Sequence, residues 1–369
     1  MLHPDADNLA LDLRTSMAGV FDVRDIRRGH DGRIWEFYGQ LTISASDAIH
    51  ALGDAFGALG FTPFLYHDGA SDVVIAYPFA ATRPAPPRWG LSIFLFLVTL
   101  ALLTITGALV QAARAGAQTT LSVAGVFDAL GDHGTAGFTF AASLMLILGA
   151  HEMGHYLTAR RSRMSISLPY FIPAPPPPWG LGTLGAFIAM RGPSPTRSAL
   201  FDMALAGPLA GLAVALPLLV IGLRQAPTAS LAVPVTPPLL AAGLAQLLRG
   251  GQAAGATIDW FDPVLFAAWL GVMLTAINLL PIGQLDGGHV AYAALGRRAV
   301  WLGRVVWVAL IALVVLSPTW GLYAVILAVV GLRHPPPQDD ITPIGRGRWL
   351  WAIAALVLLI LTFSPRPLP

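Results

Sequence analysis

Long apolar runs after residue 88 restrict the fold of this chain more than any other feature of its sequence. Most are long enough, at about 1.5 Å of rise per helical residue, to cross the hydrocarbon layer of a bilayer, which is roughly 30 Å thick. Only 11% of all residues are charged, whereas a soluble domain carries about 25%. The sequence therefore predicts a polytopic α-helical membrane protein with about six to eight transmembrane helices. The predicted spans lie near residues 90–111, 137–159, 199–223, 262–281, 300–317, 319–333 and 348–363.

The first 79 residues carry ordinary charge and only short periodic patterns. They predict a small soluble α+β domain in which a strand, a helix and two further strands follow one another. These elements are expected at residues 33–39, 46–59, 61–66 and 73–77. The predicted domains are the soluble unit at 1–79, a Pro-rich linker at 80–88, a membrane domain at 89–363 with core helices near 137–159, 199–223 and 262–290, and a tail at 364–369.

The arginines predict the orientation of the chain in the membrane. A cytoplasmic N-terminal unit puts most of them inside, including those at 160–163 and 297–298, and leaves only Arg114, Arg224, Arg249 and Arg366 outside. We therefore expect an integral membrane protein with a cytoplasmic N terminus, which in a bacterial cell means the cytoplasmic (inner) membrane. The first thirty residues show no signal peptide. The sequence has no stripe of basic residues, so we expect no nucleic-acid partner. It has no cysteine, which excludes thiolate metal ligands.

The chemistry is concentrated in one predicted span, which contains the sequence His151-Glu152-Met153-Gly154-His155. Residues four apart face the same side of a helix, so both imidazoles can share one metal ion. Glu152 follows the first histidine directly, where it can contact a water activated by the metal and take its proton. Ionisable groups within a membrane span are costly and mark function. The pattern therefore predicts a metal site with Glu152 as the catalytic base.

A zinc site of this type needs a third protein ligand, and Asp286 is the leading candidate. Pro281 and Gly283 break the preceding helix, so the backbone can turn Asp286 toward the metal. The alternative is that Asp286 caps the helix that follows it. Another acid, Asp202, lies at the start of a predicted span, as a helix-end residue or as part of a water path.

Residues 169–190 are apolar but rich in proline and glycine, which does not suit a plain helix. They predict a re-entrant β-hairpin that packs against protein and not against lipid. Gly182, Thr183 and Gly185 precede an alternating run over 186–190, which predicts an edge strand that binds an extended substrate by strand addition. The alternative is a Pro-rich loop at the membrane surface without a substrate role.

These motifs together resemble the site-2 protease family of intramembrane zinc metalloproteases, peptidase family M50. The resemblance rests on the HExxH motif at 151–155 and on the segment 278–288, which reads N-x-x-P-x-x-x-L-D-G-G. The runs at 182–186, 201–208 and 206–211 resemble the plant chloroplast EGY-like branch and its bacterial relatives. The likeness covers residues 30–300, without a recognisable PDZ insertion or CBS pair.

The resemblance implies a zinc endopeptidase that hydrolyses peptide bonds of transmembrane substrates in or near the bilayer. It implies one zinc ion per chain, bound by His151, His155 and Asp286, with Glu152 as the catalytic residue. Asn278 matches a family position for substrate contact, although a buried asparagine can also simply join two helices. The resemblance does not define the oligomeric state. Two other functions stay open: a catalytically silent membrane scaffold and a metal-ion transporter.

Overall fold

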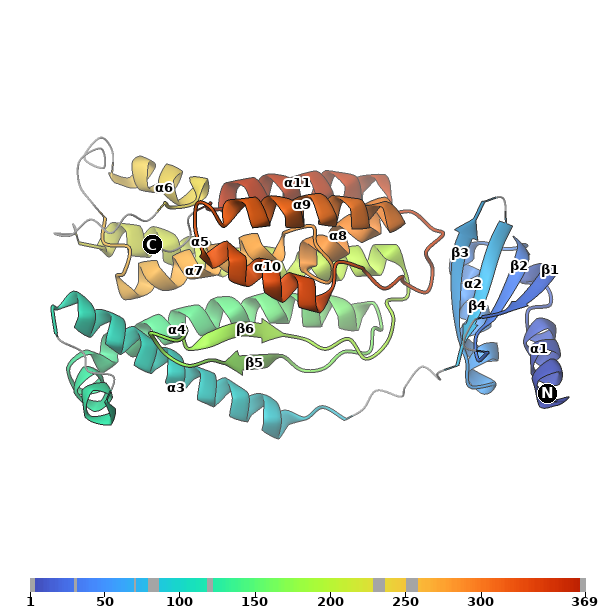
Figure 1. Cartoon of the computed structure of the whole chain (residues 1–369), viewed down its shortest axis with the longest axis horizontal. Helices are drawn as coiled ribbons and strands as arrows, with labels where there is room; N and C mark the ends of the chain where they lie inside the picture. Colours follow the sequence, from blue (N-terminus) through green and yellow to red (C-terminus); the bar gives the residue numbers. More distant parts are fainter. Residues whose placement is uncertain are drawn as a thin grey trace.

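The computed structural model describes residues 4–29, 32–69, 71–78, 86–117, 122–227, 236–249 and 258–365. Figure 1 shows a small unit with a β-sheet, formed by the N-terminal residues, and a long bundle of helices formed by the rest. The predicted linker at 80–88 and tail at 364–369 fall largely outside the described residues. The domain boundaries therefore stay a prediction.

The N-terminal unit is a four-stranded antiparallel sheet with two helices packed on one face. Its elements are α1 (Pro4–Ser16), β1 (Phe21–Arg28), β2 (Trp35–Leu41), α2 (Ala45–Ala58), β3 (Thr62–Asp68) and β4 (Ser71–Tyr77), and the strand order is β1-β2-β4-β3. Phe37, Leu65 and Val74 form a buried core with Leu52 of α2 and Leu13 of α1. Because strand residues alternate between faces, this core uses every second residue of β3 and β4 and leaves the other face without helices.

The sequence predicts three of these strands and α2, but it misses α1 and β1. In β1, the register against β2 shifts between Val23 and Asp25. This bulge breaks the alternation of apolar and polar residues on which strand prediction depends. In α1, the buried face is narrow, and Leu11 on its outer side is 58% exposed.

The remainder of the chain is mostly helical, as predicted. Its helices are α3 (Trp89–Arg114), α4 (Val123–Arg161), α5 (Arg197–Gln225), α6 (Leu239–Arg249), α7 (Pro263–Asn278), α8 (Asp286–Leu295), the 3-10 helix η2 (Gly296–Arg298), α9 (Ala299–Leu313), α10 (Thr319–Val330) and α11 (Arg346–Thr362). Among the described residues, three helices, α3, α4 and α5, are long and apolar enough to cross a membrane. The number of six to eight spans stays a prediction, because α7, α9, α10 and α11 have only 16, 15, 12 and 17 residues.

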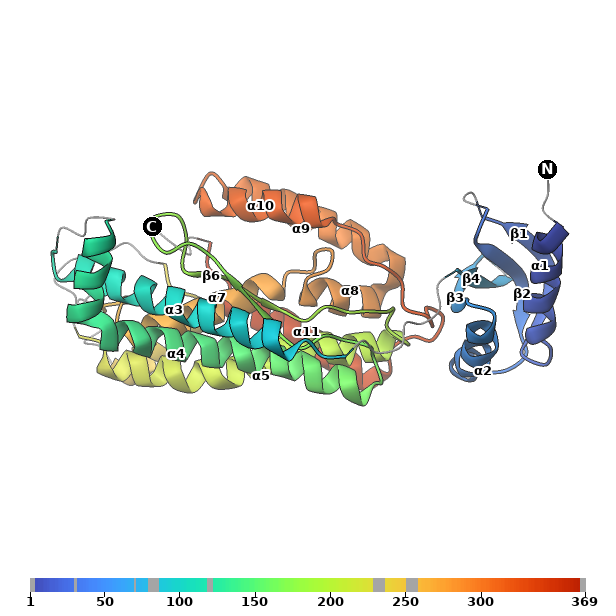
Figure 2. The ribbon, with the colours of Figure 1, turned by 90° about the horizontal axis from the view of Figure 1, so that it is seen from below.

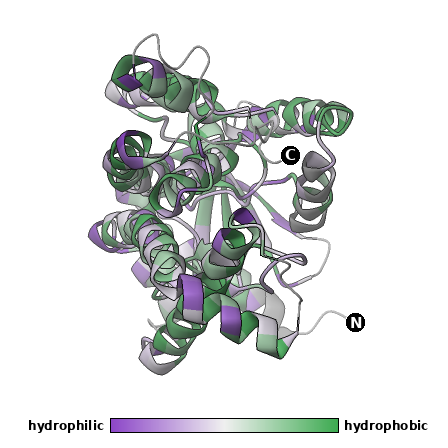
Figure 3. Cartoon of the chain, turned by 90° about the vertical axis from the view of Figure 1, so that its left-hand side faces the viewer, coloured by the Kyte–Doolittle hydropathy of each residue, from purple (hydrophilic) through white to green (hydrophobic). Residues whose placement is uncertain are grey.

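The outer surface of the helical part is apolar, which fits integration into a membrane. Large side chains such as Phe94, Trp301 and Leu350 are 62%, 65% and 71% exposed, and Figure 3 shows hydrophobic colouring on the outer helices. Inside, α4 packs between α3 and α5 (Figure 2). The crossing of α3 and α4 requires glycine, since a Cβ at Gly137 would lie 2.4 Å from the carbonyl oxygen of Thr104.

The helix break predicted before Asp286 is present. The predicted core helix over 262–290 is two helices, because α7 ends at Asn278 and α8 begins at Asp286. Gly283 in the intervening turn has φ +52, in the left-handed region that glycine tolerates, and an added Cβ there would lie 2.2 Å from a backbone oxygen. The break places the first residue of α8 inside the bundle.

A two-stranded hairpin lies along α3 and α4. Strands β5 (Tyr170–Pro173) and β6 (Thr183–Phe187) are antiparallel, and Figure 1 shows them beside α4. The predicted edge strand therefore starts earlier than residue 186. Beyond β6, residues 189–191 continue in extended form and pair with residues 165–167 through backbone hydrogen bonds.

An extended segment near the C-terminal end joins the two parts of the molecule, and we call residues 338–340 the strand clip. On one side, the Leu65 N–H donates to Gln338 O (2.7 Å) and the Asp340 N–H donates to Leu65 O (3.0 Å). On the other side, backbone N–H groups of the clip donate to the carbonyl oxygens of residues 194 and 195, just before α5 (2.8 and 3.0 Å). The clip therefore covers the β3 edge of the N-terminal sheet and fixes this sheet to the helical part.

Candidate metal centre

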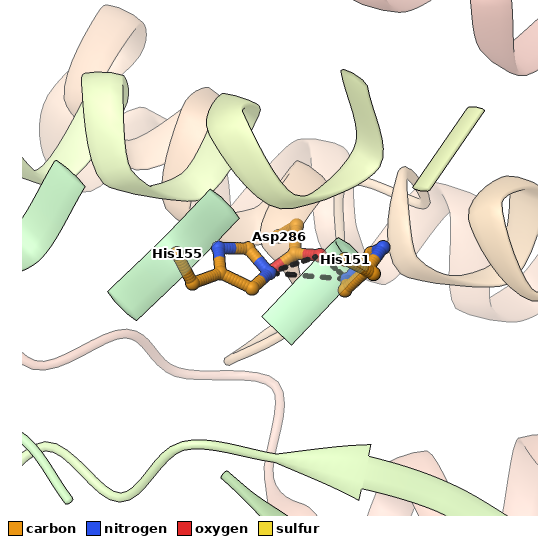
Figure 4. Close-up of side chains that lie close together, drawn as sticks. All are labelled: His151, His155 and Asp286. Carbon is orange, nitrogen blue, oxygen red and sulfur yellow. Dashed lines mark hydrogen bonds and ion pairs between the residues drawn. The ribbon is translucent and has the colours of Figure 1, made fainter. Parts of the chain in front are cut away.

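Two histidines of α4 form the base of the site. His151 and His155 are one helical turn apart, and their rings are buried, with 6% and 5% of each residue exposed. Their Nε2 atoms lie 3.1 Å apart (Figure 4). Two unprotonated nitrogens at this distance repel each other unless a proton or a cation lies between them.

Asp286 completes the group from α8. Its Oδ2 atom lies 3.2 Å from His151 Nε2 and 3.3 Å from His155 Nε2 (Figure 4). Ligand atoms at about 2.0–2.1 Å from a tetrahedral zinc ion stand about 3.3 Å apart. The spacing of the three atoms therefore matches one face of a coordination tetrahedron. Asp286 Oδ2 is also buried without a hydrogen-bond partner among the described residues. The donor set therefore suits a zinc ion, with a fourth position left open.

A hydrogen bond holds the ring of His155 in place. The Nδ1–H of His155 donates to the carbonyl oxygen of Met203 on α5 (2.8 Å), and this bond leaves the Nε2 lone pair free for a metal. Asn278, the last residue of α7, places its Nδ2 atom 3.1 Å from His151 Nε2. Asn278 thus joins two helices and also reaches the site, so both roles considered from the sequence remain compatible with its position.

Glu152 is 4% exposed and lies in the same cavity as the three candidate ligands. Its Oε2 atom has no hydrogen-bond partner in the described part of the chain. A buried carboxylate oxygen without a partner is costly. Its cost is explained if a reacting water or substrate group occupies the space in front of it.

Two cavities meet at the site. A cleft of about 1000 Å³ is lined by the candidate ligands and Glu152, by residues 186–194, by part of the N-terminal sheet and by the loop at 334–337. A smaller cavity of about 60 Å³ is lined by His151, Glu152, Asn278 and residues 184–186 of the hairpin. The hairpin therefore borders the site, as the edge-strand prediction requires.

The hairpin residues named from the sequence have different positions. Gly185 lines the smaller cavity. Thr183 is used within the hairpin, where its Oγ1 donates to Ile172 O (2.9 Å) and accepts from the Gly185 N–H (3.0 Å). Gly182 packs against α3, since a Cβ there would lie 2.7 Å from Thr106 Oγ1. Neither of the two cavities is lined by Gly182 or Thr183. Asp202 instead accepts two hydrogen bonds from Arg348, at 2.7 and 2.6 Å, and ties α5 to α11.

Glycines let α4 and α5 approach each other, and none of them was predicted to belong to the site. A Cβ at Gly207 would lie 2.1 Å from His155 Nε2, and one at Gly211 would lie 3.1 Å from His151 Cβ. On α4, a Cβ at Gly154 would lie 2.4 Å from the carbonyl oxygen of Ala206. The signal in the sequence was the G-x-x-x-G spacing of 207 and 211, typical of close helix crossings in membranes.

We predict that Gly207→Ala weakens zinc binding about 10- to 100-fold. The new methyl group collides with the coordinating nitrogen of His155, and overpacking of this kind costs about 1–3 kcal/mol. Zinc affinity, measured by competition with a chelator, checks this. Gly149→Ala in α4 is the matched control, because nothing lies within 4 Å of its Cβ position. Wild-type zinc affinity in Gly207→Ala would contradict the packing argument.

Comparison with known proteins finds relatives of this chain. Residues 139–316 match the profile of peptidase family M50. The chain is 32% identical over 238 residues to a probable zinc metalloprotease, EGY2, of Arabidopsis thaliana, which covers 63% of this chain and 42% of that protein. It is 34% identical over 244 residues to Arabidopsis EGY1, with coverages of 62% and 43%. It is 32% identical over 254 residues to EGY3 of Oryza sativa subsp. japonica, with coverages of 61% and 41%.

All three relatives are described as chloroplastic. This chain spans about two fifths of the length of the first relatives. No solved structure matches it at a significant level. The matched segment contains the histidine pair, Glu152 and Asp286, and these are the residues that the structure brings together. Residues 139–316 therefore match peptidase family M50, and the chain is similar to the EGY zinc metalloproteases.

Proposed function

We propose that this protein is an intramembrane zinc metalloprotease that hydrolyses peptide bonds of membrane-protein substrates within or near the bilayer. One observation carries the proposal. Three donor atoms from His151, His155 and Asp286, all within 4.8 Å of one another, share a buried cleft with Glu152. One of the helices that build this cleft, α4, is long and apolar enough to cross a membrane.

The residues divide the reaction between them. Zinc, when bound, would supply the Lewis acid that activates a water and polarises the scissile carbonyl. The carboxylate of Glu152 takes a proton from the attacking water and delivers it to the nitrogen of the leaving amine. Met203 O holds the His155 ring in the tautomer that leaves its Nε2 free. The amide of Asn278, which lies beside His151, would bind the substrate carbonyl.

A substrate helix must unwind before its peptide bond can react, because the helical hydrogen bonds shield the carbonyl group. Residues 184–186 of the hairpin border the small cavity beside Glu152. We propose that the unwound substrate adds as a strand to the free edge of β6. In this arrangement the hairpin is re-entrant, packed against α3 and α4 at membrane depth.

We also propose that the N-terminal unit faces the cytoplasm, as expected for a bacterial membrane. The helix ends that carry Arg88, Arg160, Arg297 and Arg346 all lie toward the N-terminal unit (Figure 1). The opposite ends carry Arg114, Arg224 and Arg249, so the excess of arginine supports this orientation. Reporter fusions after residues 80 and 164 should both give a cytoplasmic signal, and an external signal from either one reverses the orientation.

A scaffold or a metal-ion transporter is less well supported. A scaffold has no use for three donors beside the Glu152 carboxylate, whose Oε2 atom has no hydrogen-bond partner among the described residues. A transporter needs ligands along a path, whereas this group is bordered by a strand hairpin.

We predict that the purified protein binds one zinc ion per chain and that His151→Ala/His155→Ala/Asp286→Ala abolishes stoichiometric binding. Removal of all three donors leaves no ligand set in the cleft among the described residues. Elemental analysis after dialysis against a weak chelator gives the zinc content. Asp202→Ala is the matched control, since Asp202 is an acid of the same bundle that pairs with Arg348. Stoichiometric zinc in the triple variant would show that the ligands lie elsewhere.

A further inference from the structure

The face of the N-terminal sheet that carries no helix turns toward the active-site cleft. Phe64 and Tyr66 of β3 and Ile75 and Tyr77 of β4 are spaced two apart on each strand, so they share one face, opposite the buried Leu65 and Val74. These four side chains line the same cleft as Glu152 and Asp286. The wall of the cleft formed by the sheet is therefore apolar and aromatic.

The sheet is held in this position by more than its linker. The strand clip accepts a hydrogen bond from the N–H of Leu65 and donates one to the carbonyl oxygen of Leu65. It also donates hydrogen bonds to the carbonyl oxygens of residues 194 and 195. The guanidinium of Arg297, from η2, lies 4.6 Å from the ring centre of Tyr66. Ile341, next to the clip, packs against the core of the N-terminal unit. The sheet thus has a defined place relative to the metal centre.

The opposite wall is the continuation of β6. Residues 186–194 line the cleft, and residues 189–191 are extended and bonded to residues 165–167 on one side. A substrate strand that pairs with β6 at the metal centre and continues along residues 189–191 would exit from the helical part. Its exit lies between these residues and the N-terminal sheet. The cleft volume of about 1000 Å³ is at the upper end for ligand sites, about 300–1,000 Å³, and is ample for several extended residues.

We propose that the helix-free face of the N-terminal sheet is a substrate-binding wall: it holds, in extended form, the apolar or aromatic flank of the substrate that leaves the membrane next to the scissile bond. This inference rests on the proposed proteolytic function and assigns Phe64, Ile75 and Tyr77 as specificity-determining residues. The sheet reads side chains by apolar burial, whereas β6 binds the backbone without regard to sequence. Both contacts together select substrates that have an apolar segment just outside the bilayer.

Photo-crosslinking in the full chain tests the contact. The Glu152→Gln variant carries p-benzoylphenylalanine in place of Tyr77, or in place of Leu11 on α1, which is 58% exposed and lies outside the cleft. The probe is a biotinylated single-span peptide whose flank is either Leu-Phe-Leu-Phe or Gly-Ser-Gly-Ser. We expect the yield at position 77 to be about tenfold higher for the apolar flank, as expected when the burial of one or two side chains is lost. Equal yields for both flanks, or equal yields at 77 and 11, overturn the proposal.

Kinetics separate a binding wall from a simple cover over the site. In the otherwise wild-type chain, Ile75→Thr/Tyr77→Thr should raise KM about tenfold for the Leu-Phe flank and change KM much less for the Gly-Ser flank. Ile43→Thr, at a residue that is 39% exposed and outside the cleft, is the control. An equal change for both substrates refutes specificity at this wall. Cleavage of the Gly-Ser peptide by the wild type reports the proposed proteolytic function separately.

Discussion

Replacing Glu152 with glutamine is expected to lower the rate of substrate cleavage about 10²- to 10⁴-fold while zinc binding stays stoichiometric. Glutamine has nearly the same shape, but its amide cannot accept a proton from the attacking water. The proposed zinc donors are His151, His155 and Asp286, so the loss is expected to fall on chemistry and not on the metal. The measurement is single-turnover cleavage of a reconstituted single-span peptide, with zinc content determined on the same sample.

This result distinguishes the three functions considered for the chain. A scaffold or a transporter has no cleavage to lose, and a transporter with Glu152→Gln keeps its ligands and its transport. Glu36 is the only other glutamate in the sequence, and it lies on β2 of the N-terminal unit. Glu36→Gln is therefore the matched control and should cleave at the wild-type rate. Undiminished cleavage by Glu152→Gln would remove this residue from the mechanism.

The second large effect is expected from proline in the hairpin. Successive residues of a strand direct their N–H groups to opposite edges, so Ala186→Pro and Phe187→Pro remove donors on different sides of β6. One of the two breaks the pairing with β5, and we expect it to lower thermal stability. The other removes a donor that the added substrate strand needs. That variant should lose nearly all cleavage with wild-type zinc content and thermal stability, because an unmatched buried group costs about 1–3 kcal/mol and the strand is also displaced.

Alanine replacements in the same strand provide the control for the proline pair. Phe187→Ala keeps the N–H and should reduce cleavage much less than Phe187→Pro. If both proline variants cleave at the wild-type rate, β6 is a structural strand and the substrate binds elsewhere. The cleavage assay and the zinc analysis are those used for Glu152→Gln, so the two series are directly comparable.

The parts of the site that follow from local rules could be predicted from the sequence. His151 and His155 meet because a helix repeats every 3.6 residues, and this needs no knowledge of other helices. Asp286 could be placed because Pro281 and Gly283 signal a helix break in front of it. The helix and strands of 33–77 followed from their apolar periodicity.

The remaining features depend on distant pairings that periodicity does not encode. Position 207 requires glycine, which has no Cβ atom, only because α5 crosses α4 at His155. The strand clip joins Leu65 to residues 338–340, and nothing local to either segment specifies the other. The position of the N-terminal sheet over the cleft follows from this contact, so it was invisible in the sequence. Strand β1 was missed because a bulge interrupts its alternation.

The strand clip also sets the order in which the candidate site can be completed. During synthesis the N-terminal unit precedes the helical part and folds earlier, whereas residues 338–340 follow only after α10. Until then the β3 edge is open and the sheet has no fixed place. Asp286 of α8 likewise reaches His151 only after α5 and α7 have been inserted. A nascent chain therefore lacks the full donor set until α8 has been made, and it lacks the complete cleft until residues 338–340 have been made.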